Sequence, residues 1–354
     1  YNVALGAGWQ IDLFGRVRRQ TEGAQARVYA TEQGRRGVVL SVVTAMATSY
    51  LALRAFDRQL EISQRTLKNN ADTLRIFELR HKGGVVSRLE VAQVQSQYQQ
   101  ALAAIPQIEQ QIAAQENLIA VLQGRNPYPI PRGKPIDELA IPRIPEGLPA
   151  SLLARRPDIL QAEQNLIAAN ADIGAAKALY YPQFSLTGNY GSVSAAFANF
   201  LTGPAAAWTI AAGFAGPLFT AGAIAGQVQS AEAGAAEALA TYQQTILVAF
   251  RETNDALVGS VKKREEAAAQ AQRVASLREY ARLSRVRFNN GYAGYIETLY
   301  AAERAAVRTY AEQYTQVVNV YKAMGGGWID LADAATPAGR AEPLPERARA
   351  QPLF

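Results

Sequence analysis

The chain has 354 residues, a formal net charge of +6, one histidine and no cysteine. A disulfide framework, a thiol nucleophile and a Cys-ligated metal are therefore excluded, and a single histidine cannot build a His-based metal site. Lys and Arg are dispersed among Glu and Gln rather than gathered into a basic patch with interleaved aromatics, which argues against nucleic-acid binding.

The first twelve residues alternate strictly between apolar and small or polar side chains, which predicts a β-strand. The apolar positions are Tyr1, Val3, Leu5, Ala7, Trp9 and Ile11. Three basic residues follow, Arg16, Arg18 and Arg19. Basic side chains suit a level close to phospholipid headgroups, and they equally suit a solvated first turn of a helix.

A long helix is predicted over residues 16–82, which contain no proline. At 1.5 Å per residue it would be about 100 Å long, far beyond a globular domain. A ladder of three-four spacing, typical of a coiled-coil seam, runs through its second half. The ladder consists of Leu53, Phe56, Leu60, Ser63, Leu67, Asn70, Leu74 and Phe77. No transmembrane helix is expected, because the best stretch, residues 38–53, is interrupted by serines and threonines.

The predicted helix ends at a glycine turn, and the same pattern returns in the second half of the chain after another proline-free stretch, residues 221–290. One constant offset matches Arg80 with Arg287, Gly84 with Gly291 and Glu90 with Glu297. We infer a tandem duplication of strand, long helix, turn and returning helix. The large period of this repeat favours a tubular or bundle assembly over a solenoid.

Between the halves lies a linker with seven prolines, a density that excludes a regular helix and predicts an extended surface connection. They are Pro127, Pro129, Pro131, Pro135, Pro142, Pro145 and Pro149. We therefore predict four segments: a first repeat over 1–124, the linker over 125–150, a second repeat over 151–328 and a C-terminal tail over 329–354.

Residues 178–230 contain no charged side chain. Two runs within this block alternate, with Phe184, Leu186 and Tyr190 on the apolar side of the first run and Trp208, Ile210 and Phe214 on that of the second. Each run is about ten residues long, the length of a transmembrane β-strand, and one apolar face with one small or polar face suits a wall between lipid and a watery lumen. An ordinary half-buried hairpin would show the same alternation.

A helix start precedes the charge-free block at Arg155-Arg156-Pro157-Asp158-Ile159, where Pro157 suits the first turn and Asp158 the positive helix end. In this context the string strongly resembles the outer membrane factor (TolC-like) family of Gram-negative bacteria, in its OprM/NodT branch of multidrug efflux lipoproteins. Three other strings carry the same resemblance: residues 8–15 (GWQIDLFG), 216–219 (GPLF) and 325–328 (GGGW).

The resemblance implies a mainly α-helical fold with a transmembrane β-barrel portion. Three copies would share one 12-stranded barrel in the outer membrane and build a coiled-coil tunnel across the periplasm. Each copy of the family contributes four strands, of which three are found here. We therefore expect the chain to lack its N-terminal part, where a lipidated cysteine of this branch would lie.

The implied function is that of a passive efflux channel for small molecules or drugs, without cofactor, metal or enzymatic activity. The implied partners are a periplasmic adaptor and an inner-membrane transporter of the RND type. The sequence itself offers no phosphate loop or dinucleotide fingerprint. Its lone His81 lies at a basic helix end, where a solvated or capping imidazole is expected.

The resemblance also places function on the two helical turns. The adaptor-docking tips would be Gly84, Val85, Val86 and Ser87 with Gly291, Tyr292, Ala293 and Gly294. The periplasmic aperture would involve Glu297, Thr298, Tyr295 and Tyr300, with Glu297 forming an acidic ring by threefold repetition or the tyrosines narrowing the pore sterically. Alternatives are plain helix-hairpin turns for the tips and a surface ion pair for Glu297.

Two rival functions stay open at this stage. A type I protein-secretion channel would share the fold, although the Arg155–Ile159 string favours small-molecule efflux. A periplasmic adaptor or a coiled-coil scaffold would also have long helices, but neither accounts for the charge-free block.

Overall fold

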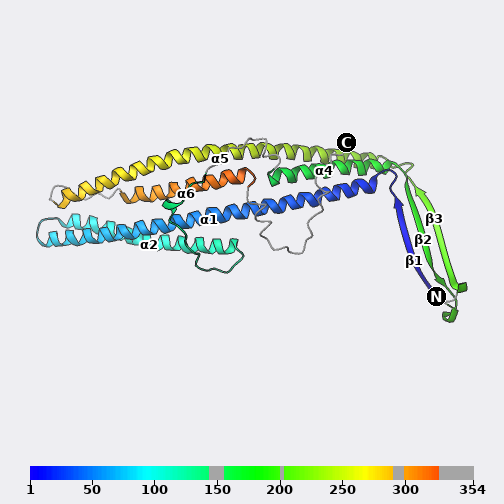
Figure 1. The fold of residues 1–354 in the computed structure, drawn as a ribbon, viewed down its shortest axis with the longest axis horizontal. Helices are drawn as coiled ribbons and strands as arrows, with labels where there is room; N and C mark the ends of the chain where they lie inside the picture. Colours follow the sequence, from blue (N-terminus) through cyan, green and yellow to red (C-terminus); the bar gives the residue numbers. More distant parts are fainter. Residues whose placement is uncertain (143–154, 200–202, 290–298, 327–354) are drawn as a thin grey trace. The chain divides into compact units, whose positions relative to one another are not determined.

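The computed structural model describes residues 1–142, 155–199, 203–289 and 299–326. Most of the described chain is helical (Figure 1). They are β1 (Asn2–Ile11), α1 (Arg16–Lys82), α2 (Arg88–Leu122), η1 (Ile136–Glu138), α4 (Pro157–Lys177), η2 (Ala178–Tyr180), β2 (Gln183–Val193), η3 (Phe197–Asn199), η4 (Gly203–Ala205), β3 (Ala206–Ala215), α5 (Ala223–Asn289) and α6 (Leu299–Ala323).

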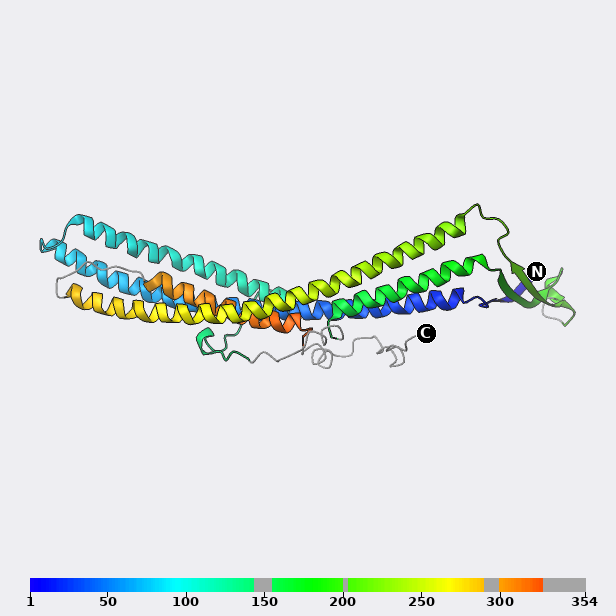
Figure 2. The same ribbon diagram turned by 90° about the horizontal axis from the view of Figure 1, so that it is seen from above.

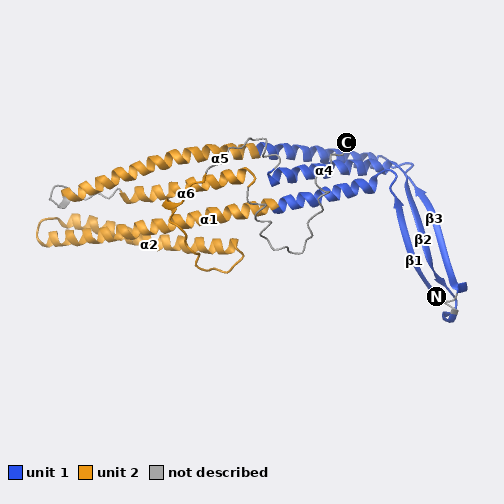
Figure 3. Cartoon of the chain, in the orientation of Figure 1, with its two compact units in different colours: residues 1–35, 153–248 blue, residues 36–152, 249–354 orange. Residues whose placement is uncertain are grey.

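The chain divides into two compact units, each drawn from both predicted repeats (Figure 3). Unit 1 comprises residues 1–35 and 153–248, and unit 2 comprises residues 36–152 and 249–354. The duplication is visible in the helix lengths, because α1 and α5 each have 67 residues.

Unit 1 contains the three strands, which form an antiparallel sheet in the order β1-β2-β3. All three strands predicted from alternation are present. β2 pairs with β1 over ten residues, from Val193 opposite Asn2 to Phe184 opposite Ile11. On its other side β2 pairs with β3, with Phe184 opposite Phe214. Each pairing spans nearly the whole strand, so the three strands lie in full register.

The helices of unit 1 approach one another through small residues and ion pairs. Gly23 of α1 faces the backbone and side chains of α4, where a Cβ would lie 3.4 Å from Asp172. Asp172 also accepts a hydrogen bond from Arg27 of α1. On the other side of α4, Lys177 pairs with Glu232 of α5 at 3.0 Å. α4 therefore lies between the first part of α1 and the first part of α5.

Unit 2 contains two helix pairs, with α2 beside α1 and α6 beside α5 (Figures 1 and 2). The predicted α1 seam is real, since all eight of its positions are buried or half-buried. Leu53 packs with Ile119 of α2, and farther along α1 Phe77 packs with Val94. In the second pair, Val274 of α5 packs with Ala302 of α6.

The proline-rich linker is extended, as expected, over its described part, and it carries one short 3-10 turn, η1. Ile136 of this turn is 1% exposed and packs between α1 and α6. The hydroxyl of Tyr314 on α6 donates to the carbonyl oxygen of Leu139, and Arg132 pairs with Asp57 of α1 at 3.1 Å. The linker thus fastens α6 to α1 rather than merely connecting two halves.

One helix meets the length and composition criterion for a membrane span, which no stretch was expected to meet. Among the described residues, α1 contains an 18-residue stretch with a mean hydropathy of 1.6, long and apolar enough by composition to cross a membrane, and 39% of it is buried. Near Leu53 the apolar side chains of α1 pack against α2 and the linker, as those of a core helix do. Length and composition alone are therefore weak evidence for a span here.

Candidate functional site: strand faces and helical turns

The register of the sheet gathers the apolar side chains of all three strands on one face. Directly opposed residues lie on the same face of an antiparallel pair, so Leu5, Tyr190 and Trp208 form one cross-strand row. Trp208 is 71% exposed, and Phe214 of another row is 77% exposed. A continuous apolar face of this kind marks contact with lipid or with another protein rather than with water.

The opposite face carries small or uncharged polar residues. Its rows include Gly8, Thr187 and Ala211, then Asn189 with Thr209. No row contains an ionisable side chain, and none contains a large apolar one apart from Val193 at the strand end. This is the face expected to line a watery lumen.

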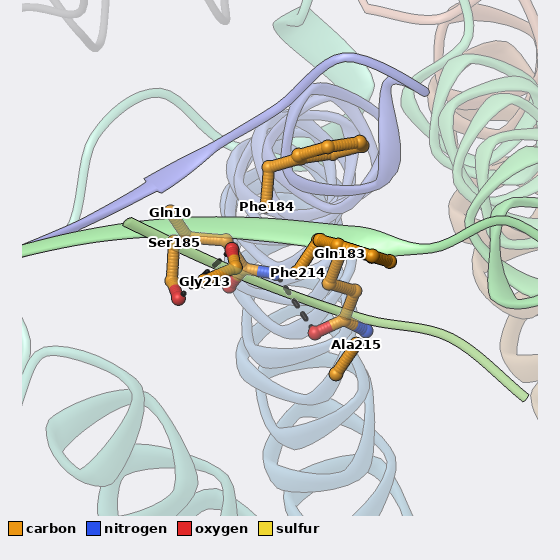
Figure 4. Close-up of a pocket in the computed structure, with 7 residues that line it drawn as sticks. All are labelled: Gln10, Gln183, Phe184, Ser185, Gly213, Phe214 and Ala215. Carbon is orange, nitrogen blue, oxygen red and sulfur yellow. Dashed lines mark hydrogen bonds between the residues drawn. The ribbon is translucent and has the colours of Figure 1, made fainter. Parts of the chain in front are cut away.

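Figure 4 shows the end of the sheet next to the helices, where a recess of about 310 Å³ is lined by uncharged residues. Phe184 lies on one side of β2, and Ser185 and Ala215 lie on the other. Gln10 of β1 donates to Gln183 of β2 at 3.0 Å. These groups can hydrogen-bond water or a polar solute, but the lining offers no acid or base that could activate the Ser185 hydroxyl.

The turn between α1 and α2 is the first of the two predicted docking tips. Gly84 adopts the left-handed conformation, φ +73°, which glycine tolerates without cost. Ser87 caps α2: its hydroxyl accepts from the Glu90 backbone N–H, while the Glu90 carboxylate accepts from the Ser87 N–H at 2.8 Å. The Ser87 backbone hydrogen bond lowers the pKa of Glu90. This capping box was not predicted, although Ser-x-x-Glu is its recognised sequence signature.

His81 closes the same turn. Its Nδ1 lies 2.9 Å from the carbonyl oxygen of Val86, which fits the capping role expected from the sequence. Val85, at the outermost part of the turn, is 73% exposed. A hydrophobic side chain displayed on a backbone fixed by Gly84 and Ser87 can serve as a contact point for a partner.

The second turn lies mostly outside the described residues. This applies to the predicted docking residues Gly291, Tyr292, Ala293 and Gly294, and to the predicted aperture residues Tyr295, Glu297 and Thr298. Of the aperture set, Tyr300 at the start of α6 is described. Its hydroxyl lies 2.9 Å from Ser63 Oγ of α1, and the Arg304 guanidinium lies 5.5 Å from its ring centroid.

Close to Tyr300 the structure brings together charges that sequence reasoning missed. Glu303 of α6 is only 5% exposed. One of its oxygens accepts from Arg65 of α1 at 2.5 Å, and the other accepts from Arg278 of α5 at 2.9 Å. This ion cluster, Glu303 with Arg65 and Arg278, joins three helices. The three residues lie in three separate segments of the sequence. Nothing in a single sequence indicates which residues of different helices will pair, so this cluster could not be predicted.

The Arg155-Arg156-Pro157-Asp158 string begins α4, with Pro157 in its first turn. Arg156 is buried and forms a two-pronged pair with Asp158, at 2.6 Å and 3.0 Å, whereas Arg155 is exposed. These contacts stabilise the start of α4 and indicate a structural role for the string. Over the described part of the chain, no group of three or more His, Cys, Asp or Glu is placed to hold a metal ion.

Comparisons with known proteins agree with this arrangement. The chain matches the outer membrane efflux protein family over residues 1–125 and 148–326. It is 32% identical to the solvent efflux pump outer membrane protein SrpC of Pseudomonas putida over 335 residues, covering 93% of this chain and 71% of SrpC. It is 32% identical over 347 residues to the outer membrane protein OprJ of Pseudomonas aeruginosa, covering 93% and 70%.

A solved structure shares the fold. The open state of the Neisseria gonorrhoeae MtrE outer membrane channel superimposes with a TM-score of 0.86 at 28% identity, over 92% of this chain and 76% of that one. The fold is thus that of the TolC-like channels, as the resemblance implied. On the family match and the SrpC identity together, the chain belongs to the outer membrane efflux protein family.

Proposed function

We propose that three copies of this chain form the outer membrane channel of a tripartite efflux system. The channel is a passive conduit in the Gram-negative outer membrane and periplasm and performs no bond chemistry. Relatives such as SrpC are named efflux pump components, which favours small-molecule efflux over protein secretion. The proposed partners are a periplasmic adaptor and an RND-type inner-membrane transporter, which supplies the energy.

The observation that carries the proposal is the two-faced sheet, apolar on one side and uncharged polar on the other. A three-stranded sheet with the order β1-β2-β3 has an unpaired edge at β1 and another at β3. Unpaired backbone groups are too costly in hydrocarbon, so a sheet in a membrane must close into a barrel. The described residues supply three of the four strands per copy that the family resemblance implies. Four strands from each of three copies would close a barrel of 12.

The test is thiol labelling along β2 in intact outer membranes, using the absence of cysteine in this segment. Single cysteines at Ser185, Thr187 and Asn189 are expected to react with a hydrophilic thiol reagent. Matched cysteines at Phe184, Leu186 and Tyr190 are expected to stay unlabelled, because they face lipid. Uniform labelling at all six positions would show that the sheet never meets a bilayer and would remove the channel proposal.

Adaptor docking is proposed at the two turns, residues 84–87 and 291–294. The first turn supports this through its fixed backbone and its displayed apolar side chains. Val85 is 73% exposed, and Leu89, one turn into α2, is exposed as well. Adaptor hairpins of complementary apolar surface would bury both.

Gating is proposed at the second turn, where Glu297 would form an acidic ring around the threefold axis, with Tyr295, Thr298 and Tyr300 beside it. Glu297→Ala is expected to lower cation over anion selectivity, measured as the reversal potential in a planar bilayer under a salt gradient. Glu90→Ala, the repeat-related change in the first turn, is the control and should leave the reversal potential unchanged. Unchanged selectivity in the Glu297 variant would remove this residue from the constriction.

A further inference from the structure

The folded chain gathers basic side chains at the end of unit 2 where α1 and α5 stop. Figures 1 and 2 show the end of α1, the start of α2 and the end of α5 at the same end of this unit. Residues 75–90 and 278–289, which cover these helix ends, contain eight basic and three acidic residues. With His81 neutral their net charge is +5, against +6 for the whole chain. Residues 290–298 add one further charge, that of Glu297.

Five of these basic side chains are exposed and form no ion pair with a described carboxylate. We call this group the basic collar. Its members are Arg75 and Lys82 of α1, Arg88 of α2, and Arg285 and Arg287 of α5. Farther along α1 the arginines have acidic partners, as Arg58 does in its pair with Glu61 at 2.7 Å. The collar therefore differs from the rest of the helical surface in lacking counter-charges.

The acidic residues of this end do not neutralise the collar. The Glu90 carboxylate accepts from the Ser87 N–H within the cap of α2. Glu279 accepts from Arg282 of its own helix at 2.6 Å. Glu78, which is exposed, sets one negative charge against the five positive charges of the collar. A surplus of positive charge thus remains at the helix ends.

Such an unbalanced patch is unfavourable in the isolated chain, because like charges repel one another. The repulsion is relieved when a surface of opposite charge covers the patch, and the same charges accelerate the encounter. Lys82 and Arg88 also flank the first turn, where Val85 is 73% exposed. An apolar contact point with a charged rim is the usual anatomy of a protein–protein interface, which favours a polypeptide as the partner.

We propose that the basic collar determines which partner docks at the helical turns, and that the adaptor surface which meets it is acidic. This inference rests on the proposed adaptor docking and deepens it. It assigns a charge to the partner and adds five residues of α1, α2 and α5 to the docking surface. The apolar contact at Val85 would hold the complex, while the collar would steer the adaptor to it.

Binding of two synthetic helical peptides to the full-length channel in phosphatidylcholine nanodiscs tests the proposal. One peptide is based on alanine and glutamate, and the other has glutamine at every glutamate position. The collar variant combines Arg75→Gln, Lys82→Gln and Arg88→Gln. The replaced side chains are exposed and without a described acidic partner, so the variant is expected to fold.

A matched control removes the same charge elsewhere in unit 2. It combines Arg125→Gln, Lys134→Gln and Arg251→Gln, three exposed positions outside the collar. At about 20 mM salt the glutamate peptide is expected to bind the unaltered channel and the control alike. Its association rate constant should fall about tenfold in the collar variant, because rim charges act mainly on the rate of encounter. The difference should disappear at about 300 mM salt, where the charges are screened, and the glutamine peptide should not bind.

Three results would overturn the proposal. The glutamate peptide might as well be neutral if it fails to bind at low salt, and an equal loss in both variants would mean a general effect of net charge. Collar-dependent binding of phosphatidylglycerol vesicles in place of the peptide would assign the collar to an anionic membrane. None of these results bears on the thiol labelling along β2, which tests the channel itself, so the two failures are distinguishable.

Discussion

The two helix pairs of unit 2 have the same architecture but differently filled seams. The α1–α2 seam buries Leu53, Phe77, Val94 and Ile119. The fully buried apolar residues of the α5–α6 seam are mostly alanine, with Val274 and Val320 as the largest, and larger side chains such as Leu277 and Leu299 pack there only partly buried. The alanines are Ala256, Ala302, Ala306 and Ala323. The offset that relates Arg16 to Ala223, the first residues of the two long helices, places the buried Leu53 at the position of the buried Ser260.

This difference has an energetic consequence. Burying a leucine or phenylalanine side chain stabilises by roughly 1.5–3 kcal/mol, and a single methyl group by about 0.8 kcal/mol. The second pair therefore gains less from its seam and depends more on polar contacts, chiefly the ion cluster of Glu303. A pair held in this way can separate at lower cost, which fits the proposed gate at its turn.

The greatest loss of stability is expected at Leu53, in the seam with the larger side chains. Leu53→Ala should lower the free energy of local opening of the α1–α2 pair by about 2–5 kcal/mol, since it leaves a cavity against Ile119 and Ile130. Ser260→Ala, at the matched position, should change the free energy of local opening of the α5–α6 pair by about 0.5–1 kcal/mol. The reason is that the Ser260 hydroxyl donates to the Leu257 carbonyl of its own helix, so its removal breaks no contact between helices. Amide hydrogen exchange measures the free energy of local opening of both helix pairs. Equal losses in the two variants would refute the difference between the two seams.

A smaller effect is expected at the ion cluster. Glu303→Ala removes hydrogen bonds to Arg65 and Arg278, but both guanidiniums are half exposed and regain water. The free energy of local opening of the α5–α6 pair should therefore fall by about 1.5–3 kcal/mol, which is less than for a fully buried ion pair. Faster exchange at the start of α6 and a larger resting conductance in planar bilayers are expected. Glu312→Ala, which removes a partly exposed pair with Lys263 and a longer one with Arg308, is the control and should cost no more than about 1 kcal/mol.

The smallest effect concerns the first turn and depends on pH. The pKa of Glu90 is lowered by its hydrogen bond from the Ser87 backbone. Its contribution to the turn is therefore complete above the ordinary glutamate pKa and is lost as the pH falls through the lowered pKa. Exchange at the start of α2 should accelerate over that acidic range. Glu90→Gln keeps an acceptor but does not titrate, so acceleration of the same size in that variant would rule out Glu90 as its source.

The two turns also differ in the residue that could cap the returning helix. Gly294 stands where the first turn has Ser87, so the second turn has no hydroxyl for a reciprocal box with Glu297. This difference in sequence favours the proposed place of Glu297 at the aperture.

Local sequence patterns were enough to predict the helices and strands and the faces that they bury or expose. The alternation of Val3 to Ile11 and of the charge-free block fixed which side of each strand is apolar, because side chains on a strand point to opposite faces with a period of two. The three-four ladder fixed the α1 seam, and the repeated glycine turns fixed where the long helices end. Resemblance to the efflux family came from short strings alone.

The contacts between distant segments, in contrast, could not be predicted from these patterns and are seen in the folded chain. Residues 12–182, nearly half of the chain, separate β1 from β2. The full register of the three strands puts their apolar faces together. Ile136 of a proline-rich linker became a core residue between α1 and α6. Glu303, an unremarkable helix residue in the sequence, acquired two arginine partners from two other helices. Local periodicity sets the direction of a side chain, whereas its partners depend on how helices and strands far apart in the chain pack together.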